Sequence, residues 1–176
     1  RMTEAQTEYT PVKVDLDFRY KTTSLERRYT QQHVKDVVAL YSRIISEYYY
    51  IQDRELDCFV TEKPESAMSW QVKPGTIPEE PNAELGIAKD GIHLMFPYLV
   101  TKTKYQLLFR DSVLKEIDGI LGDLDLSNTM ADVVDLAVVD RNNWMMYGSQ
   151  KVSSEPYLLS RIYRLDGGVV DELPTD

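Results

Sequence analysis

Residues 12–20, VKVDLDFRY, place two carboxylates inside a short run of alternating apolar residues. Side chains two positions apart on a β-strand point to the same face, so Asp15 and Asp17 would lie side by side on a sheet. Two like charges in that arrangement repel each other unless a cation lies between them. Carboxylate oxygens are the ligands that Mg²⁺ and Mn²⁺ prefer. The pattern therefore indicates a divalent-metal site, although most such pairs of acids are simply solvated.

Composition limits the class of protein. The chain has 176 residues, enough for one domain with a hydrophobic core. Its single cysteine, Cys58, excludes a disulfide framework and a cysteine-based zinc site, and it fits a reducing compartment inside a cell. No apolar run approaches the roughly 20 residues that span a bilayer, so we expect no membrane partner. The net charge of −9 argues against a general nucleic-acid coat protein.

Hydrophobic periodicity predicts strands that alternate with helices. We expect strands over residues 12–18, 56–62, 91–97, 133–139 and 157–165, and helices over residues 30–50 and 103–121, with Thr30 as the N-cap of the first. Residues 1–10 are interpreted as a lead-in, residues 63–90 as a long excursion without regular structure, residues 122–129 as a loop and residues 166–176 as a linker. This order favours an α+β fold with helices on one side of a sheet.

Further candidate site residues lie downstream. His93 and Met95 share one face of the strand that Gly91 opens, although a lone histidine on a strand is usually structural. Asp135 interrupts an apolar run, where a charge is costly unless it is paired or bound to metal. A second pair of acids, Asp123 and Asp125, lies among turn-forming residues. We interpret that pair as solvated, and it is the main competitor for the metal site.

Asp15-x-Asp17, Gly91-x-His93 and the late Asp135 occur in this order, followed by the stretch RNNWMMYGS. With these motifs the chain resembles the archaeo-eukaryotic primase superfamily. It is most similar to the primase module at the N-terminal side of primase-helicases from nucleocytoplasmic large DNA viruses. The resemblance covers most of the chain, from near residue 12 to near residue 163. It rests on the stretches VDLDF, CFVTEKP, KDGIHLMFP, VVDLAVVDRNNWMMYGSQK and EPYLLSRIY.

The resemblance implies a primase-polymerase catalytic core, with an RRM-like antiparallel or mixed sheet packed by helices. The catalytic domain would span residues 1–165, truncated at its N-terminal side, and residues 166–176 would lead to a further domain. That domain would be a helicase at the C-terminal side of the same polypeptide; residues 1–176 contain no Walker A motif of their own. The protein would act where viral DNA is replicated in the host cell, in a cytoplasmic factory or the nucleus.

The resemblance also assigns roles to residues. Asp15, Asp17 and Asp135 would be the catalytic ligands of two Mg²⁺ or Mn²⁺ ions, which join a nucleoside triphosphate to the 3′-hydroxyl of the strand being extended. The nucleotide-binding set would be Lys89, Gly91, His93, Asn142, Asn143 and Lys151. The activity would be that of a nucleotidyltransferase, a DNA primase or primase-polymerase that starts or extends primers on a single-stranded DNA template.

Two departures from the family pattern leave other readings open. Cellular relatives carry arginine around Asn142 and Met145, and they carry zinc-binding cysteines that a single Cys58 cannot replace, so no zinc is expected. One alternative is a nuclease, which would use the same two metal ions. Another is a non-catalytic DNA-binding or assembly module of a replicative helicase. A sugar-transferring enzyme with a D-x-D motif is disfavoured because the chain shows no secretory signal.

Overall fold

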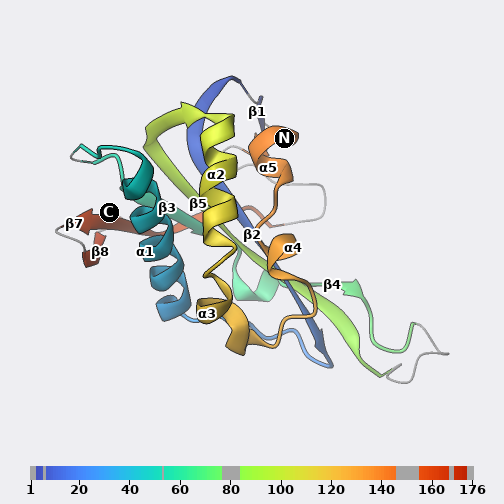
Figure 1. Cartoon of the computed structure of the whole chain (residues 1–176). Coiled ribbons are helices and arrows are strands. Elements are labelled where there is room, and N and C mark those ends of the chain that lie inside the picture. The colour runs from blue at the N-terminus through green and yellow to red at the C-terminus, as the bar shows by residue number, and fades with distance from the viewer. Residues whose placement is uncertain are drawn as a thin grey trace.

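The computed structural model describes residues 3–5, 7–52, 54–76, 84–145, 155–166 and 169–173. Together they form an antiparallel sheet covered by helices, which confirms the α+β class (Figure 1). The strands are β1 (Thr3–Glu4), β2 (Tyr9–Thr22), β3 (Cys58–Glu62), β4 (Ser69–Val72), β5 (Gly86–Lys102), β6 (Trp144–Met145), β7 (Leu158–Asp166) and β8 (Val169–Leu173). The helices are α1 (Gln31–Tyr48), α2 (Thr103–Val113), α3 (Asp118–Leu121), α4 (Met130–Val133) and α5 (Ala137–Asp140), with single 3₁₀ turns at Glu65–Ala67 and Gly122–Leu124.

The main sheet has the order β2-β5-β3-β7-β8, and β4 pairs with the same edge of β5 as β3 does. Each described pair of neighbours in this sheet is antiparallel. Strands β2 and β5 are long and pair over most of their length. Figure 1 shows that the C-terminal end of β2 and the N-terminal end of β5 extend beyond the helices. Together with β4 they form an arm, called here the β4–β5 arm.

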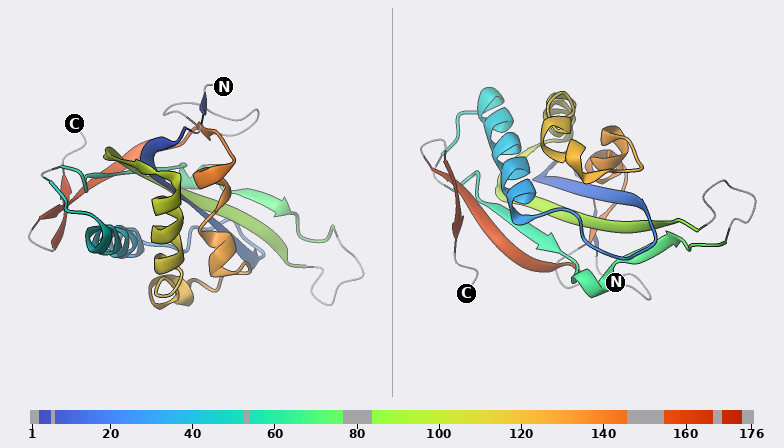
Figure 2. Two further views of the ribbon diagram at one scale, coloured as in Figure 1. Left: turned by 45° about the horizontal axis from the view of Figure 1, so that its top comes forward. Right: turned by 90° about the horizontal axis from the view of Figure 1, so that it is seen from below.

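Alternation along β2 separates the two faces of the sheet. Val12, Val14, Leu16 and Phe18 are buried in the core, on the side where α1 and α2 pack (Figure 2). Asp15 and Asp17 point to the opposite, open face, as the two-residue period requires. Thr30 caps α1 as predicted, and the side chain of His33 accepts a hydrogen bond from the Thr30 backbone N–H. No helix in the described part of the chain is long and apolar enough to cross a membrane.

Two segments expected to be irregular contain short strands. Within the predicted lead-in, Thr3–Glu4 pairs with Trp144–Met145. Within residues 63–90, Ser69 and Trp70 pair with Lys89 and Ala88, and β5 already begins at Gly86. These predictions were wrong because strands of two to four residues show no clear alternation and depend on distant partners.

The predicted strand over residues 133–139 is also wrong, because α4 and α5 occupy most of this stretch. Thr129 caps α4 in a reciprocal pair of hydrogen bonds with Asp132, and Asp135 accepts a hydrogen bond from the Ala137 N–H at the start of α5. Only Val134 makes an isolated bridge, to Leu16. The apolar run therefore packs as two short helices joined by residues 134–136.

The ends of two other predicted elements differ from the structure. The helix expected over residues 103–121 is interrupted after Val113 and resumes as α3 at Asp118. Strand β7 is not the last strand, since Val169–Leu173 folds back and pairs with it as β8. The division into a domain over residues 1–165 and a linker over 166–176 stays a prediction, although part of that linker belongs to the sheet.

Candidate active site

The open face of the sheet is ordered in rows, because residues directly opposite each other on antiparallel strands share a face. In the first row, Asp15 on β2 lies opposite His93 on β5, which lies opposite Thr61 on β3. In the second row, Asp17 lies opposite Gly91. The register therefore joins the two motifs predicted from the sequence, with the two rows roughly 7 Å apart along the strands.

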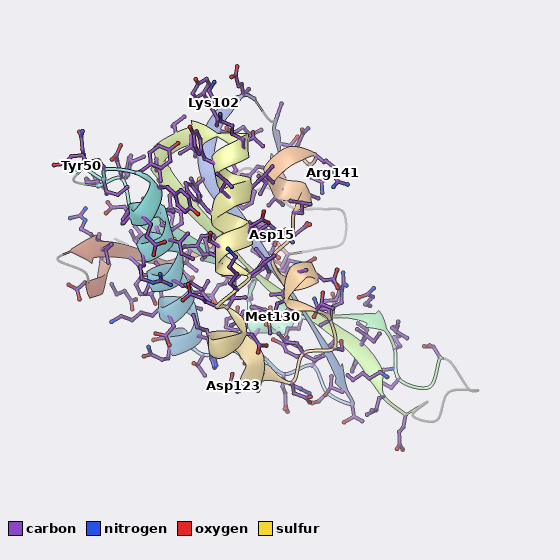
Figure 3. All side chains as sticks on the ribbon, in the orientation of Figure 1. Asp15, Tyr50, Lys102, Asp123, Met130 and Arg141 are labelled. Carbon is purple, nitrogen blue, oxygen red and sulfur yellow. The ribbon has the colours of Figure 1, made fainter. Side chains whose placement is uncertain are left out.

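A cleft of about 720 Å³ lies over these rows. Seven of the nine predicted site residues line it: Asp15, Asp17, Lys89, His93, Asp135, Asn142 and Asn143. Gly91 lies beside Asp17 in the second row, and Lys151 lies outside the described residues. Figure 3 shows Asp15 near the middle of the molecule and Arg141, which also lines the cleft, at α5.

Asp135 reaches the cleft because its segment follows the outer edge of β2. Its backbone N–H donates to the Asp15 carbonyl at 3.0 Å. Asn128, earlier in the same segment, donates to the Asp17 carbonyl at 2.9 Å and accepts from the Arg19 N–H at 3.1 Å. Arg110 of α2 holds the segment in place by donating to the Val134 carbonyl at 2.9 Å. Backbone pairing therefore holds the segment of Asp135 against the strand that carries Asp15 and Asp17.

His93 is nearly buried and is held between aromatic rings. The Tyr157 ring stacks on it with centroids 3.6 Å apart and planes 14° apart, and the Trp144 ring centroid is 4.7 Å away. Its Nε2 lies 3.5 Å from the Asp15 carboxylate. The orientation of the imidazole is thus fixed by β6 and by the residue that precedes β7.

Gly91 permits a close approach between strands. A Cβ at this position would lie 2.8 Å from the Leu16 carbonyl oxygen, 3.1 Å from the Tyr157 hydroxyl oxygen and 3.7 Å from an Asp17 carboxylate oxygen. Contacts to backbone under 3.0 Å cannot form without a shift of the chain. Glycine therefore leaves the space that the Tyr157 hydroxyl occupies beside Asp17.

Negative charge is concentrated around the Tyr157 hydroxyl. Burial, reinforced by the carboxylates of Asp15, Asp17 and Asp90, raises the pKa of Tyr157 far above its ordinary value. The hydroxyl consequently stays protonated and can donate a hydrogen bond. The Lys63 ammonium lies 5.1 Å from the centroid of the Tyr157 ring.

Arg27, in the segment between β2 and α1, supports this region. Its guanidinium donates twice to the Asp90 carboxylate, at 2.8 and 3.0 Å, and once to the Lys63 carbonyl at 2.9 Å. Asp90 in turn accepts from the Gly91 N–H at 2.9 Å. Arg27 therefore neutralises one buried acid and ties the strand that carries Gly91 and His93 to the end of β3.

The donor atoms fit a hard divalent cation, because Asp15, Asp17 and Asp135 all present carboxylate oxygens to one cleft. One Asp135 oxygen already accepts the Ala137 N–H at 2.9 Å. In the described ranges, no group of three or more His, Cys, Asp or Glu side chains is close enough together to hold a metal ion. Metal binding at these three acids therefore stays a prediction.

The competing pair of acids lies elsewhere. Asp123 lies below Asp15 at the lower side of the molecule in Figure 3, and the Asp123 and Asp125 side chains are 70% and 89% exposed. Asp123 lies 3.1 Å from His33 Nε2, and Asp125 lies 3.1 Å from the Arg28 guanidinium. The interpretation of this pair as solvated surface acids is confirmed.

Sequence reasoning did not single out Lys63, Asp90, Trp144 and Tyr157, all of which line the cleft. Each of them lies in a stretch that carried the family resemblance. No periodic pattern marks them, however, because their places depend on contacts with His93, Gly91 and Arg27 across the sheet. Their location in those stretches was the available signal.

The pairing of a two-acid strand with a glycine-x-histidine strand, with a third acid along the free edge, is the arrangement expected of an archaeo-eukaryotic primase domain. Comparison with known families agrees, since residues 1–163 match the model described as the C962R protein N-terminal AEP domain. The chain belongs to this family of archaeo-eukaryotic primase domains, as its motifs predicted.

One relative comes from a giant virus. The chain is 30% identical over 165 residues to the protein of Acanthamoeba polyphaga mimivirus named "Putative helicase L207/L206". The alignment covers 92% of this chain but only 16% of the viral protein. The resemblance to the viral primase-helicase branch is confirmed by this relative and by the family match.

Proposed function

We propose that this primase-type domain is a nucleotidyltransferase that starts or extends primers on single-stranded DNA, using ribo- or deoxyribonucleoside triphosphates. The register of Asp15 with His93 and of Asp17 with Gly91, under a cleft that Asp135 also lines, carries the proposal. A cleft of about 720 Å³ lies in the range of small-molecule sites.

The three acids would hold two Mg²⁺ or Mn²⁺ ions. Bound there, the ions would supply activation of the attacking 3′-hydroxyl and stabilisation of the charge on the leaving pyrophosphate. Lys89 would neutralise the charge of the triphosphate, and His93 would donate a hydrogen bond to its oxygens. The aromatic contacts on His93 would keep its imidazole aimed at the cleft.

Other partners follow from the family and from the relative. Asn142 and Asn143, which line the cleft, and Lys151 would donate to nucleotide or template. The name of the mimivirus relative supports a helicase domain on the same polypeptide, beyond residues 166–176. The proposed setting is the site of viral DNA replication in a host cell.

The decisive experiment measures nucleotide incorporation on single-stranded DNA with Mg²⁺ or Mn²⁺. We expect Asp17→Asn to abolish incorporation and Asp123→Asn, the same change at a solvated acid, to leave it unchanged. Full activity of Asp17→Asn would remove this site from consideration. Shortening of the DNA without any need for triphosphate would instead identify a nuclease. If DNA is bound but neither extended nor shortened, the domain is a non-catalytic module.

A further inference from the structure

A third row lies next to the two rows of the candidate active site. Arg19 on β2 is directly opposite Lys89 on β5, and Lys89 is directly opposite Ser69 on β4. Residues paired in this way share a face, and Arg19 is two positions after Asp17 on the same strand. The third row therefore lies on the open face, roughly 7 Å beyond the second.

Two cations directly opposite each other on a sheet destabilise it. Nearby arginines in the described part of the chain are neutralised, as Arg27 is by Asp90 and Arg161 is by Glu62. Arg19 has no such ion pair among the described residues, and its Nε is buried without a hydrogen-bond partner. The fold thus places two cations opposite each other beside the cleft, and among the described acids the charge of Arg19 acts on the Asp132 carboxylate.

The three side chains have the chemistry of a phosphate site. Arginine offers a fork of donors, lysine a point charge and serine a hydroxyl, and all three groups suit the oxygens of a phosphate. Lys89 and Ser69 line the cleft itself. Since the whole chain carries a charge of −9, this pair is a local feature and not part of a generally basic surface.

We infer that Arg19, Lys89 and Ser69 bind a phosphate group one row beyond the acids, an inference that rests on the proposed function. The phosphate belongs either to a DNA strand that follows the open face toward the β4–β5 arm (Figure 1) or to the nucleoside triphosphate. Both sources present the same chemistry, and they can be separated by binding measurements that require no turnover.

The test measures binding of a labelled oligothymidylate and, separately, of a nucleoside triphosphate with Mg²⁺. We expect Arg19→Gln to weaken binding of one of these ligands about five- to tenfold and Arg19→Lys to retain most of it. For DNA, the slope of log affinity against log salt falls by about one. The control is Arg43→Gln on α1, whose guanidinium is paired with Glu47 and Glu116.

Loss of oligothymidylate binding alone assigns the phosphate to the polynucleotide, and loss of triphosphate binding alone assigns it to the nucleotide. Wild-type binding of both ligands by Arg19→Gln and by Lys89→Gln overturns the inference. The melting temperature of Arg19→Gln should stay close to that of the wild type, because the substitution removes both the repulsion from Lys89 and the attraction to Asp132. A clear fall in melting temperature, with Arg19→Lys equally impaired, shows a structural role and also overturns it.

Separate results would contradict the phosphate site and the proposed nucleotidyl transfer. If the protein incorporates no nucleotide but Arg19→Gln still weakens binding, only the proposed reaction is wrong. If incorporation depends on Asp17 while the Arg19 and Lys89 variants bind both ligands normally, the phosphate site and the proposed contact of Lys89 with the triphosphate are wrong, and the proposed reaction stands.

Discussion

The His93 imidazole lies flat against the Tyr157 ring, with centroids 3.6 Å apart and planes 14° apart. This stack joins strand β5 to the residue immediately before β7, although β3 lies between the two strands in the sheet. The position of the histidine therefore depends on the aromatic ring of Tyr157, whereas the hydroxyl of Tyr157 lies beside Gly91 and the acids.

Substitution of Tyr157 separates these two contributions. Tyr157→Leu removes the stack, and we expect it to raise the KM for nucleoside triphosphate about two- to tenfold, since aromatic pairs contribute about 0.5–1.5 kcal/mol. Tyr157→Phe keeps the stack and should leave this KM close to the wild-type value. Steady-state incorporation kinetics at varied triphosphate concentration provide the measurement. Equal KM values for the Leu and Phe variants would contradict a role for the ring.

Gly91→Ala should destabilise the protein, because the new Cβ would lie 2.8 Å from the Leu16 carbonyl oxygen, which belongs to backbone and cannot rotate away. Overpacking of this kind costs about 1–3 kcal/mol of the free energy of unfolding. Gly119→Ala in α3 is the matched control, since nothing lies within 4 Å of its Cβ. Urea denaturation should show the first variant to be weaker and the second equal to the wild type or stronger.

The pH dependence of stability should show a contribution from Asp57. Its buried carboxylate accepts hydrogen bonds from Arg164 and Arg54 that outweigh the desolvation caused by burial, so the pKa of Asp57 lies below its ordinary value. A carboxyl group whose pKa is lowered on folding stabilises the protein at pH values above its unfolded-state pKa of about 4. This contribution is lost as the pH falls from that value through the lower folded-state pKa. Asp57→Asn should therefore cost about 1.5–3 kcal/mol at pH 7, the range for hydrogen bonds to charged groups, because the Arg54 and Arg164 side chains that it leaves behind are 57% and 36% exposed.

This difference in unfolding free energy should shrink as the pH is lowered from 5 toward 3, when measured by urea denaturation at each pH. Asp111→Asn is the control, because the Asp111 side chain is 69% exposed and its nearest cation, Arg110, is 3.9 Å away. A difference between Asp57→Asn and the wild type that does not change with pH would contradict the assignment.

Arg110 offers a test of how Asp135 is positioned. Arg110 does not line the cleft over Asp15 and Asp17. Its guanidinium donates to the carbonyls of Val134 and Ala131, in the segment that carries Asp135. We expect Arg110→Gln to lower kcat and to raise the Mn²⁺ concentration that gives half-maximal incorporation. Arg43→Gln on α1 should change neither quantity. Reduced stability without any change in metal requirement would show that Arg110 only supports the fold.

Much of the fold could be predicted where periodicity is strong. The alternation along β2 and the three-to-four spacing along α1 are set by residues buried on a single face, such as Val14, Leu16, Val34 and Val38. Strand β1 and helices α4 and α5 were not predicted, because each is four residues or shorter, and β1 pairs with a strand far along the chain. Local sequence contains no record of such partners.

The candidate site likewise has a part that the sequence predicts and a part that depends on tertiary structure. Asp15 and Asp17 could be placed on one face from spacing alone, and His93 could be placed on the same face of its own strand as Met95. That Asp15 faces His93 depends on the register of β2 with β5, and that Tyr157 covers His93 depends on the path of the chain into β7. Both depend on tertiary contacts, which leave no periodic pattern in the sequence.

The segment that carries Asp135 also closes one side of the sheet. Strand β2 ends the strand order, and an uncovered edge strand offers its backbone groups to strands of other molecules, which promotes aggregation. Asn128, the Val134 bridge and the Asp135 N–H occupy those groups at intervals along β2. Solubility and the completeness of the acidic site therefore depend on the same few hydrogen bonds, so a variant that releases this segment would lose both together.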